Sequence, residues 1–187
     1  VDSKFDNILA YEAVVYLGED TQADLSGLTV RLLNNGFEMN QNINQKPFLL
    51  CSYCNQTTLR SSTFQLNQAL KGDSASSGYG ALIAAVNFKE TLTLQECKFS
   101  NNVVTESLIF INVEGLDFDP EKASLDTTHL TIEDCDFEAN GADYLIYYSM
   151  KQVPHNFLLA KVNFTANYFF KALVMVAKQG GIEAYSK

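Results

Sequence analysis

The sequence predicts an all-β protein that folds as a parallel β-helix, a solenoid of about five to six stacked coils with loop insertions. Three observations lead to this prediction. A short motif recurs along the chain, apolar and polar residues alternate within each copy, and a further apolar run follows the copies. The repeat comes first, because self-similarity at a period of tens of residues is typical of repeat architectures.

In each copy of the motif a Phe is followed three residues later by an Asn. The phenylalanines are Phe37, Phe64, Phe99, Phe137 and Phe164, and the asparagines are Asn40, Asn67, Asn102, Asn140 and Asn167. Successive phenylalanines are 27, 35, 38 and 27 residues apart. An aliphatic residue also stands five positions before each Phe, at Leu32, Leu59, Leu94, Ile132 and Leu159.

Local periodicity favours β-strands over helices in each copy. Leu92 and Leu94 alternate with polar residues, and after a slip of one residue Cys97 and Phe99 do so again. This is the two-residue period of a strand, interrupted by a bend. Apolar runs follow at 108–111, 144–148 and 173–176. The longer intervals are expected to carry loops at 71–80 and 114–126, which are rich in Gly and Ser or in acidic residues.

Stacking of the coils explains why the same residue returns at the same place. Neighbouring strands lie about 4.8 Å apart, so equivalent side chains stand above one another. We therefore expect the five phenylalanines to stack inside the solenoid and the five asparagines to stack at a turn. Each Asn amide would donate to one neighbour and accept from the other, and Asn tolerates the left-handed backbone that a sharp turn requires. This predicts a structural role for all ten residues.

Length and composition are consistent with one domain over residues 1–187, because 47% of the 187 residues are hydrophobic. Recognisable coils span 28–177. Residues 1–27 include an apolar stretch at 13–17 and are expected to form an earlier coil or a partial cap. Neither end shows a strong amphipathic helical cap, which an exposed coil end would need. We therefore expect the chain to be a segment of a larger protein.

Charge and hydropathy exclude two classes of partner. The formal net charge is −9 and no basic stripe is visible, so nucleic acid and anionic membrane surfaces are not expected to bind. The longest apolar runs are far shorter than the roughly 20 residues that cross a bilayer, so no membrane span is predicted.

The four cysteines fall into two pairs. Cys97 and Cys135 both stand two residues before the motif Phe, so they are expected to be neighbours, either as a disulfide or as free thiols that face inward. Cys51 and Cys54 form a Cys-x-x-Cys that lacks the second half of a zinc site, which favours a local disulfide or plain packing.

Two sequons for N-glycosylation are present, at Asn55-Gln-Thr57 and Asn163-Phe-Thr165. Asn163 directly precedes a motif Phe, so its side chain should face solvent if the Phe faces inward. Together with the even number of cysteines, the sequons favour passage through a eukaryotic secretory pathway and an extracellular or cell-surface location.

A search for catalytic groups yields no coherent site. In the column before the motif Phe only Lys98 and Asp136 are charged, and as stacked opposite charges they predict a surface ion pair. Acidic residues crowd near Asp136 (Glu133, Asp134 and Glu138) and at Asp117, Asp119 and Glu121, without an ordered calcium-loop motif. His129 and His155 precede repeats and are expected to be turn residues. No catalytic residue, metal ligand or cofactor is therefore predicted.

The repeated Phe-x-x-Asn, together with Gly78-Tyr-Gly-Ala-Leu82, resembles the right-handed parallel β-helix repeats of the pectin-lyase-like superfamily. In style it is similar to the polymorphic outer membrane proteins of chlamydiae and to large β-helix surface proteins of ciliates and other protists. The resemblance covers about residues 28–177 and implies a right-handed coil. It implies no single activity, because the superfamily includes polysaccharide lyases and hydrolases as well as adhesins and structural surface proteins.

The apolar runs after the motif suggest a function. At 108–111, 144–148 and 172–176 both alternating sets of residues are apolar, so something should cover the outer face. Loops of the chain, a neighbouring domain or another subunit would serve. The leading hypothesis is a non-catalytic structural or adhesive segment that contacts other protein chains or further coils. The alternative is a polysaccharide lyase or glycoside hydrolase acting on an acidic polysaccharide; carbohydrate binding through Tyr147 or Tyr148 is a third hypothesis.

Overall fold

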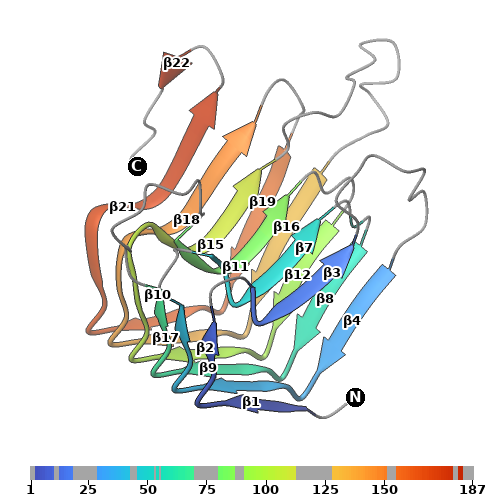
Figure 1. The fold of residues 1–187 in the computed structure, drawn as a ribbon. Coiled ribbons are helices and arrows are strands. Elements are labelled where there is room, and N and C mark those ends of the chain that lie inside the picture. The colour runs from blue at the N-terminus through green and yellow to red at the C-terminus, as the bar shows by residue number, and fades with distance from the viewer. Residues whose placement is uncertain are drawn as a thin grey trace.

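A computed structural model describes residues 3–10, 13–18, 29–42, 46–52, 54, 56–69, 80–86, 91–112, 128–150, 155–178 and 181–182. These residues form strands and turns, and the strands wind as a right-handed parallel β-helix (Figure 1). The predicted fold class is confirmed. The two predicted loops lie outside the described residues except for Gly80.

Three parallel sheets run along the solenoid. The Phe sheet contains β1 (Lys4–Asp6), β5 (Gly36–Glu38), β9 (Thr63–Gln65), β13 (Lys98–Ser100), β17 (Asp136–Glu138) and β20 (Asn163–Thr165). The entry sheet contains β4 (Thr29–Leu33), β8 (Gln56–Arg60), β12 (Thr91–Gln95), β16 (Thr128–Glu133) and β19 (His155–Ala160). From β4 onward, each coil passes through the entry sheet, then the Phe sheet, then a third sheet.

The third sheet, called the long sheet here, contains two strands in most coils. Its strands are β2 (Leu9–Ala10), β3 (Val15–Gly18), β6 (Gln41–Asn42), β7 (Leu49–Ser52), β10 (Gln68–Ala69), β11 (Ala81–Val86), β14 (Val103–Val104), β15 (Ser107–Asn112), β18 (Gly141–Met150), β21 (Tyr168–Lys178) and β22 (Gly181–Ile182). All pairings in it are parallel except that of β21 with β22.

Register follows the repeat. The motif phenylalanines are paired across the Phe sheet, and their rings are stacked with centroids 4.6 to 5.5 Å apart. Phe37, Phe64, Phe99 and Phe137 are at most 1% exposed. The alternation of β12, in which Leu92 and Leu94 are buried between half-buried neighbours, places the aliphatic columns beside this stack.

An earlier coil precedes the first motif. β1, β2 and β3 pair with β5, β6 and β7, and the ring of Phe5 lies 4.8 Å from that of Phe37. Phe5 does not belong to a copy of the motif, because Ile8, and not Asn, stands three residues after it. Among the described residues this first coil has no strand in the entry sheet.

The sharp turns differ from expectation in one respect. The left-handed residue is not the motif Asn but the one before it: φ is 52° at Met39, 56° at Leu66 and 52° at Ala139. Its side chain then faces outward, as for Leu66, which is 43% exposed, while the following Asn turns inward. A second left-handed column ends the entry strands, at Asn34, Ser61, Glu96, Asp134 and Lys161.

On the outer face of the long sheet, Ala84 and Phe110 are 0% and 5% exposed, and Leu50, Val86 and Tyr147 of the same sheet pack beside them. These two side chains are therefore buried and do not form an open apolar surface. Of the two tyrosines in the carbohydrate hypothesis, Tyr148 lies in the core at 5% exposure and does not face outward, which leaves Tyr147.

Candidate interaction surface: the last coil

The motif asparagines form one continuous column, the Asn ladder. Asn67 shows the pattern: its backbone N–H and its Nδ2 donate to Oδ1 of Asn102 at 3.0 and 2.9 Å, and Nδ2 also donates to the carbonyl of Phe37 at 2.9 Å. The same contacts link Asn40, Asn67, Asn102, Asn140 and Asn167. The ladder residues Asn40, Asn67, Asn102 and Asn140 are at most 1% exposed. Their side-chain amides are hydrogen-bonded, as buried polar groups generally are.

The ladder has a direction, so its two ends differ. At the first coil it ends without an open group, since Asn40 Oδ1 accepts from the backbone N–H of Ile8 at 3.0 Å. At the last coil Asn167 donates to the carbonyl of Phe137 at 2.7 Å, but within the described part of the chain its backbone N–H has no acceptor. Among the described residues, donors of the ladder therefore remain available at one end only.

The turn residues repeat this asymmetry. The backbone N–H of Met39 donates to the carbonyl of Gln65 at 3.0 Å, and that of Ala139 donates to the carbonyl of Thr165 at 2.9 Å, each in the next coil. The equivalent donors of the last coil are those of Ala166 and Lys161. No coil follows them among the described residues, and neither has such a bond there.

Core side chains are uncovered in the last coil, which spans residues 155–178. Phe164 is 41% exposed, whereas Phe137 beneath it is 1% exposed. Phe157 and Leu173 are likewise 42% and 43% exposed. A hollow of about 350 Å³ lies at this end, lined by Phe164, Ala166, Asn167, Phe169 and Leu173. It combines apolar walls with the end of the Asn ladder.

Further apolar side chains and positive charge surround the end. Tyr168 and Phe170 are 73% and 79% exposed. Residues 155–178 contain three lysines and no acidic residue, in a chain whose net charge is −9. Lys171 is paired with Asp143 of the coil beneath and lies 5.4 Å from the ring centroid of Tyr144. The hydrogen bond to Asp143 raises the pKa of Lys171, which keeps this cation charged.

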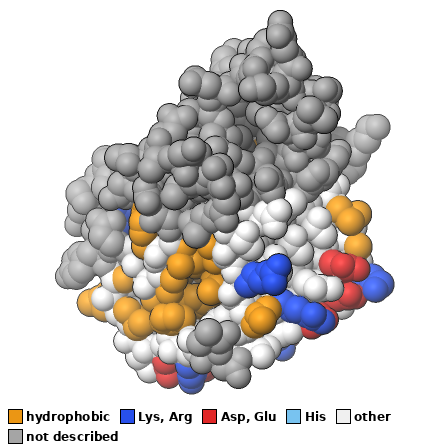
Figure 2. Space-filling model, turned by 90° about the vertical axis from the view of Figure 1, so that its right-hand side faces the viewer, with side chains coloured by type: hydrophobic (Ala, Val, Ile, Leu, Met, Phe, Trp, Pro, Cys, Tyr) orange, Lys and Arg blue, Asp and Glu red, His pale blue; other side chains and the backbone are white. Residues whose placement is uncertain are grey.

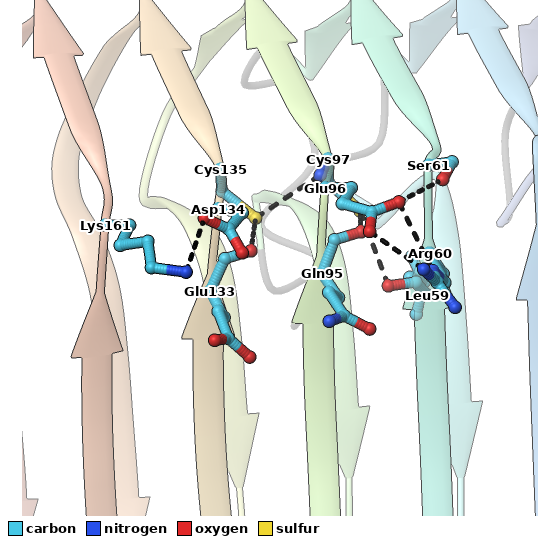
Figure 3. Close-up of polar contacts among 10 residues, drawn as sticks. All are labelled: Leu59, Arg60, Ser61, Gln95, Glu96, Cys97, Glu133, Asp134, Cys135 and Lys161. Carbon is cyan, nitrogen blue, oxygen red and sulfur yellow. Dashed lines mark hydrogen bonds and ion pairs between the residues drawn. The ribbon is translucent and has the colours of Figure 1, made fainter.

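The turn between the entry and Phe sheets carries a charged outer row (Figure 3). Arg60 binds Glu96 through Nε and Nη2, at 3.2 and 2.9 Å, and Ser61 donates to the same carboxylate at 2.8 Å. The hydrogen bond from Arg60 lowers the pKa of Glu96. Farther along, Lys161 lies 3.4 Å from Asp134. All four ionised side chains are more than a third exposed, so these pairs add little stability.

Beneath this row lie Cys97 and Cys135, which the structure brings together as free, buried thiols. The backbone N–H of Cys97 donates to Cys135 Sγ at 3.4 Å. The structure contains no disulfide between Cys97 and Cys135. The two thiols instead donate to carbonyls of the turn, such as those of Gln95 and Glu133. The hydrogen bond to Cys135 and burial raise the pKa of Cys97.

The other two cysteines form a disulfide, Cys51–Cys54, as one of the two sequence alternatives had it. Of the sequons, Asn163 is exposed, and its Nδ2 donates to Asp136 at 2.8 Å. Asn55 lies outside the described residues.

The expected ion pair between Lys98 and Asp136 is absent from the structure. The two residues are paired in register, but Lys98 Nζ lies 4.0 Å from Glu138, and Asp136 is engaged by Asn163. No group of three or more metal-ligating side chains occurs among the described residues. The acidic residues Asp117, Asp119 and Glu121 lie outside the described residues. The side chains of His129 and His155 are not described either.

No protein-family model, curated protein or solved structure matches the chain. In the part of the chain that the structure describes, no helix is both long and apolar enough to span a membrane. The site must therefore be interpreted from its geometry alone. Sequence reasoning located the ladder and the stack but missed the last coil as a surface, although the absence of acidic residues from 155–178 was a signal for it.

Proposed function

We propose that the protein is a non-catalytic structural segment that contacts another protein through its last coil. The observation that carries this proposal is the exposure of Phe157, Phe164 and Leu173, which occupy core positions and are each more than 40% exposed. Exposed apolar groups beside unpaired strand edges favour association, because both lose their contact with water on binding.

An extracellular or cell-surface location is part of the proposal. The Cys51–Cys54 disulfide supports it, since disulfides persist mainly in oxidising compartments. The exposed side chain of Asn163, in a sequon, supports it as well. Treatment of the natural protein with a peptide-N-glycosidase should lower its mass, and Asn163→Gln should abolish that glycan.

Footprinting with hydroxyl radicals tests the contact whatever the partner is. Tyr168 and Phe170 should be oxidised readily in the isolated chain and be protected in the native material, in the cells that make the protein. Val103, which is 45% exposed on an interior coil, is the matched control and should react equally in both states. Equal oxidation of Tyr168 and Phe170 in both states would refute the contact.

One observation favours the second candidate, an enzyme acting on an acidic polysaccharide. A hollow of about 390 Å³ on the Phe sheet is lined in part by Lys98, Asp136 and Glu138, which places two carboxylates beside a cation. Incubation with polygalacturonate and calcium, followed by the absorbance of unsaturated products, tests for lyase activity. Turnover that disappears in Glu138→Gln would establish the enzyme and displace the structural proposal.

A further inference from the structure

A second column of buried side chains stands at the turn between the entry sheet and the Phe sheet, apart from the Asn ladder. It contains Asn35, Ser62, Cys97 and Cys135, which occupy the same place in four successive coils because the strands on both sides of the turn are in register. All four residues are at most 3% exposed. The column thus changes from oxygen-bearing side chains in two coils to thiols in the next two.

A hydroxyl and a thiol make the same hydrogen bonds in this column. Ser62 Oγ donates to the carbonyl two residues before it at 3.1 Å and accepts from the backbone N–H of Asn35 at 3.3 Å. Cys135 Sγ donates to the carbonyl two residues before it at 3.2 Å and accepts from the backbone N–H of Cys97 at 3.4 Å. Because a serine satisfies the turn in the same way, these hydrogen bonds alone do not account for two consecutive cysteines.

The two thiols are placed for a covalent bond. Equivalent residues of neighbouring strands lie about 4.8 Å apart, and disulfides join residues whose Cα atoms are about 4.4–6.8 Å apart. The side chains of Cys97 and Cys135 both face the core, and a hydrogen bond joins their thiols. Formation of a disulfide between them therefore requires no rearrangement of the sheets.

The pair is chemically asymmetric. The hydrogen bond from the Cys97 thiol, together with the backbone N–H of the same residue, lowers the pKa of Cys135. The bond between the thiols and burial raise the pKa of Cys97. Because the thiolate is the nucleophile in thiol–disulfide exchange, Cys135 is the sulfur expected to attack first and Cys97 the one expected to complete the reaction.

We propose that Cys97 and Cys135 are a reversible redox pair, which a small-molecule disulfide R–S–S–R oxidises to a disulfide between two coils. The Cys135 thiolate attacks one sulfur of the oxidant, the S–S bond breaks and a first thiolate leaves. The Cys97 thiol then gives up its proton and attacks Cys135 Sγ, which expels a second thiolate. The two cysteine protons end on the released thiols, so the pair loses two electrons and the oxidant becomes two R–SH.

The charged outer row lies over the pair and controls how an oxidant reaches it. Arg60, Glu96, Asp134 and Lys161 are each more than a third exposed, whereas the thiols are at most 1% exposed. Figure 2 faces the side on which β4 lies in Figure 1, and it shows basic and acidic side chains next to one another at the surface. Oxidation in the folded chain should therefore be slow, and it should accelerate when mild denaturant opens the turn.

Peptide mapping tests for the bond directly. The purified chain is incubated with oxidised glutathione, once in buffer and once in denaturant below the unfolding midpoint, and free thiols are then capped with N-ethylmaleimide. Mass spectrometry of the digest should find peptides joined through Cys97 and Cys135, formed faster in denaturant, and excess reduced glutathione should release them. Two capped thiols under both conditions, or two separate glutathione adducts, would overturn the inference. The result does not depend on the proposed contact through the last coil.

Two serine variants separate the roles of the thiols, and Ser62 shows that a serine fits this column. Cys97→Ser should stop at a stable mixed disulfide between Cys135 and glutathione, because the second thiol is missing. Cys135→Ser should form its adduct about tenfold more slowly or less, because burial keeps the pKa of Cys97 raised. Circular dichroism establishes that both variants are folded. Equal rates of adduct formation would overturn the assigned order of attack.

The bond should also hold the two coils together. Cys97 and Cys135 are 38 positions apart, and closure of such a loop lowers the equilibrium constant for unfolding by about two to three orders of magnitude. Denaturant titration of the oxidised and reduced forms measures this change, in a Cys51→Ser, Cys54→Ser background so that only this pair differs. Cys97→Ser in the same background is the control and should not respond to the oxidant. Equal midpoints of the oxidised and reduced forms would contradict a staple between the coils.

Discussion

The interior coils and the last coil carry the same motif but differ in what surrounds it. Phe137 and Phe164 occupy equivalent positions, yet the first is 1% exposed and the second 41%. The side-chain amide of Asn140 donates to the carbonyl of Phe99 and to Oδ1 of Asn167. The backbone N–H of Asn167, by contrast, has no acceptor among the described residues. A side chain of one type is therefore a core residue or a surface residue according to whether another coil covers it.

The largest contrast is expected at the ring stack. Phe99→Ala removes a side chain that is 0% exposed and leaves a cavity, so the free energy of unfolding should fall by about 3–5 kcal/mol. Phe164→Ala should cost less than half as much, because its ring is already partly in water. Denaturant titration of both variants measures the difference. Equal losses would mean that the last coil is as well packed as the interior.

The Asn ladder should show the next largest contrast. Asn102→Ala leaves two donors of Asn67 and the carbonyl of Phe64 buried without a hydrogen-bond partner. The substitution should therefore lower the free energy of unfolding by about 3 kcal/mol. Asn167→Ala should cost about 1 kcal/mol, since its neighbourhood is only part-buried. Hydrogen exchange should locate the first loss in the interior coils. Comparable effects at both positions would remove the distinction between ladder centre and ladder end.

Removal of the Cys51–Cys54 disulfide shows whether a covalent constraint within one coil stabilises the protein as much as stacking between coils does. Its two cysteines are three positions apart, and closure of so short a loop stabilises by about 2 kcal/mol. The double substitution Cys51→Ser and Cys54→Ser should therefore cost less than Phe99→Ala. Cys97→Ser, which breaks no covalent bond, is the control. A loss larger than that of Phe99→Ala would make the disulfide the main constraint.

The smallest effect is expected at the exposed pair of Arg60 and Glu96. The pKa of Glu96 is lowered, so its contribution to stability is present above the ordinary Glu pKa and is lost as pH falls through the lower folded value. Arg60→Gln should bring the pKa of Glu96 back toward 4.5, as measured by NMR titration. An unchanged Glu96 titration would show that the pair is absent in solution.

The sequence was sufficient for the architecture because the repeat itself encodes the register. Five phenylalanines and five asparagines at matching offsets can stack in only one alignment. What could not be predicted depends on neighbours in space. The exposure of Phe164 follows from the absence of a described coil above it. The left-handed backbone was assigned to Asn, but the fold places it at Met39 and its equivalents because the Asn must turn inward.

The left-handed turns leave the chain room to become more stable. Non-glycine residues adopt positive φ at eleven of the described positions, including Leu66 at 56° and Glu96 at 55°. Three of the eleven are asparagine, and each of the others carries a conformational cost of about 1 kcal/mol that glycine or asparagine largely avoids. Because the strain recurs once or twice per turn of the solenoid, a handful of outward-facing replacements such as Leu66→Gly could raise the melting temperature without touching any contact that defines the fold.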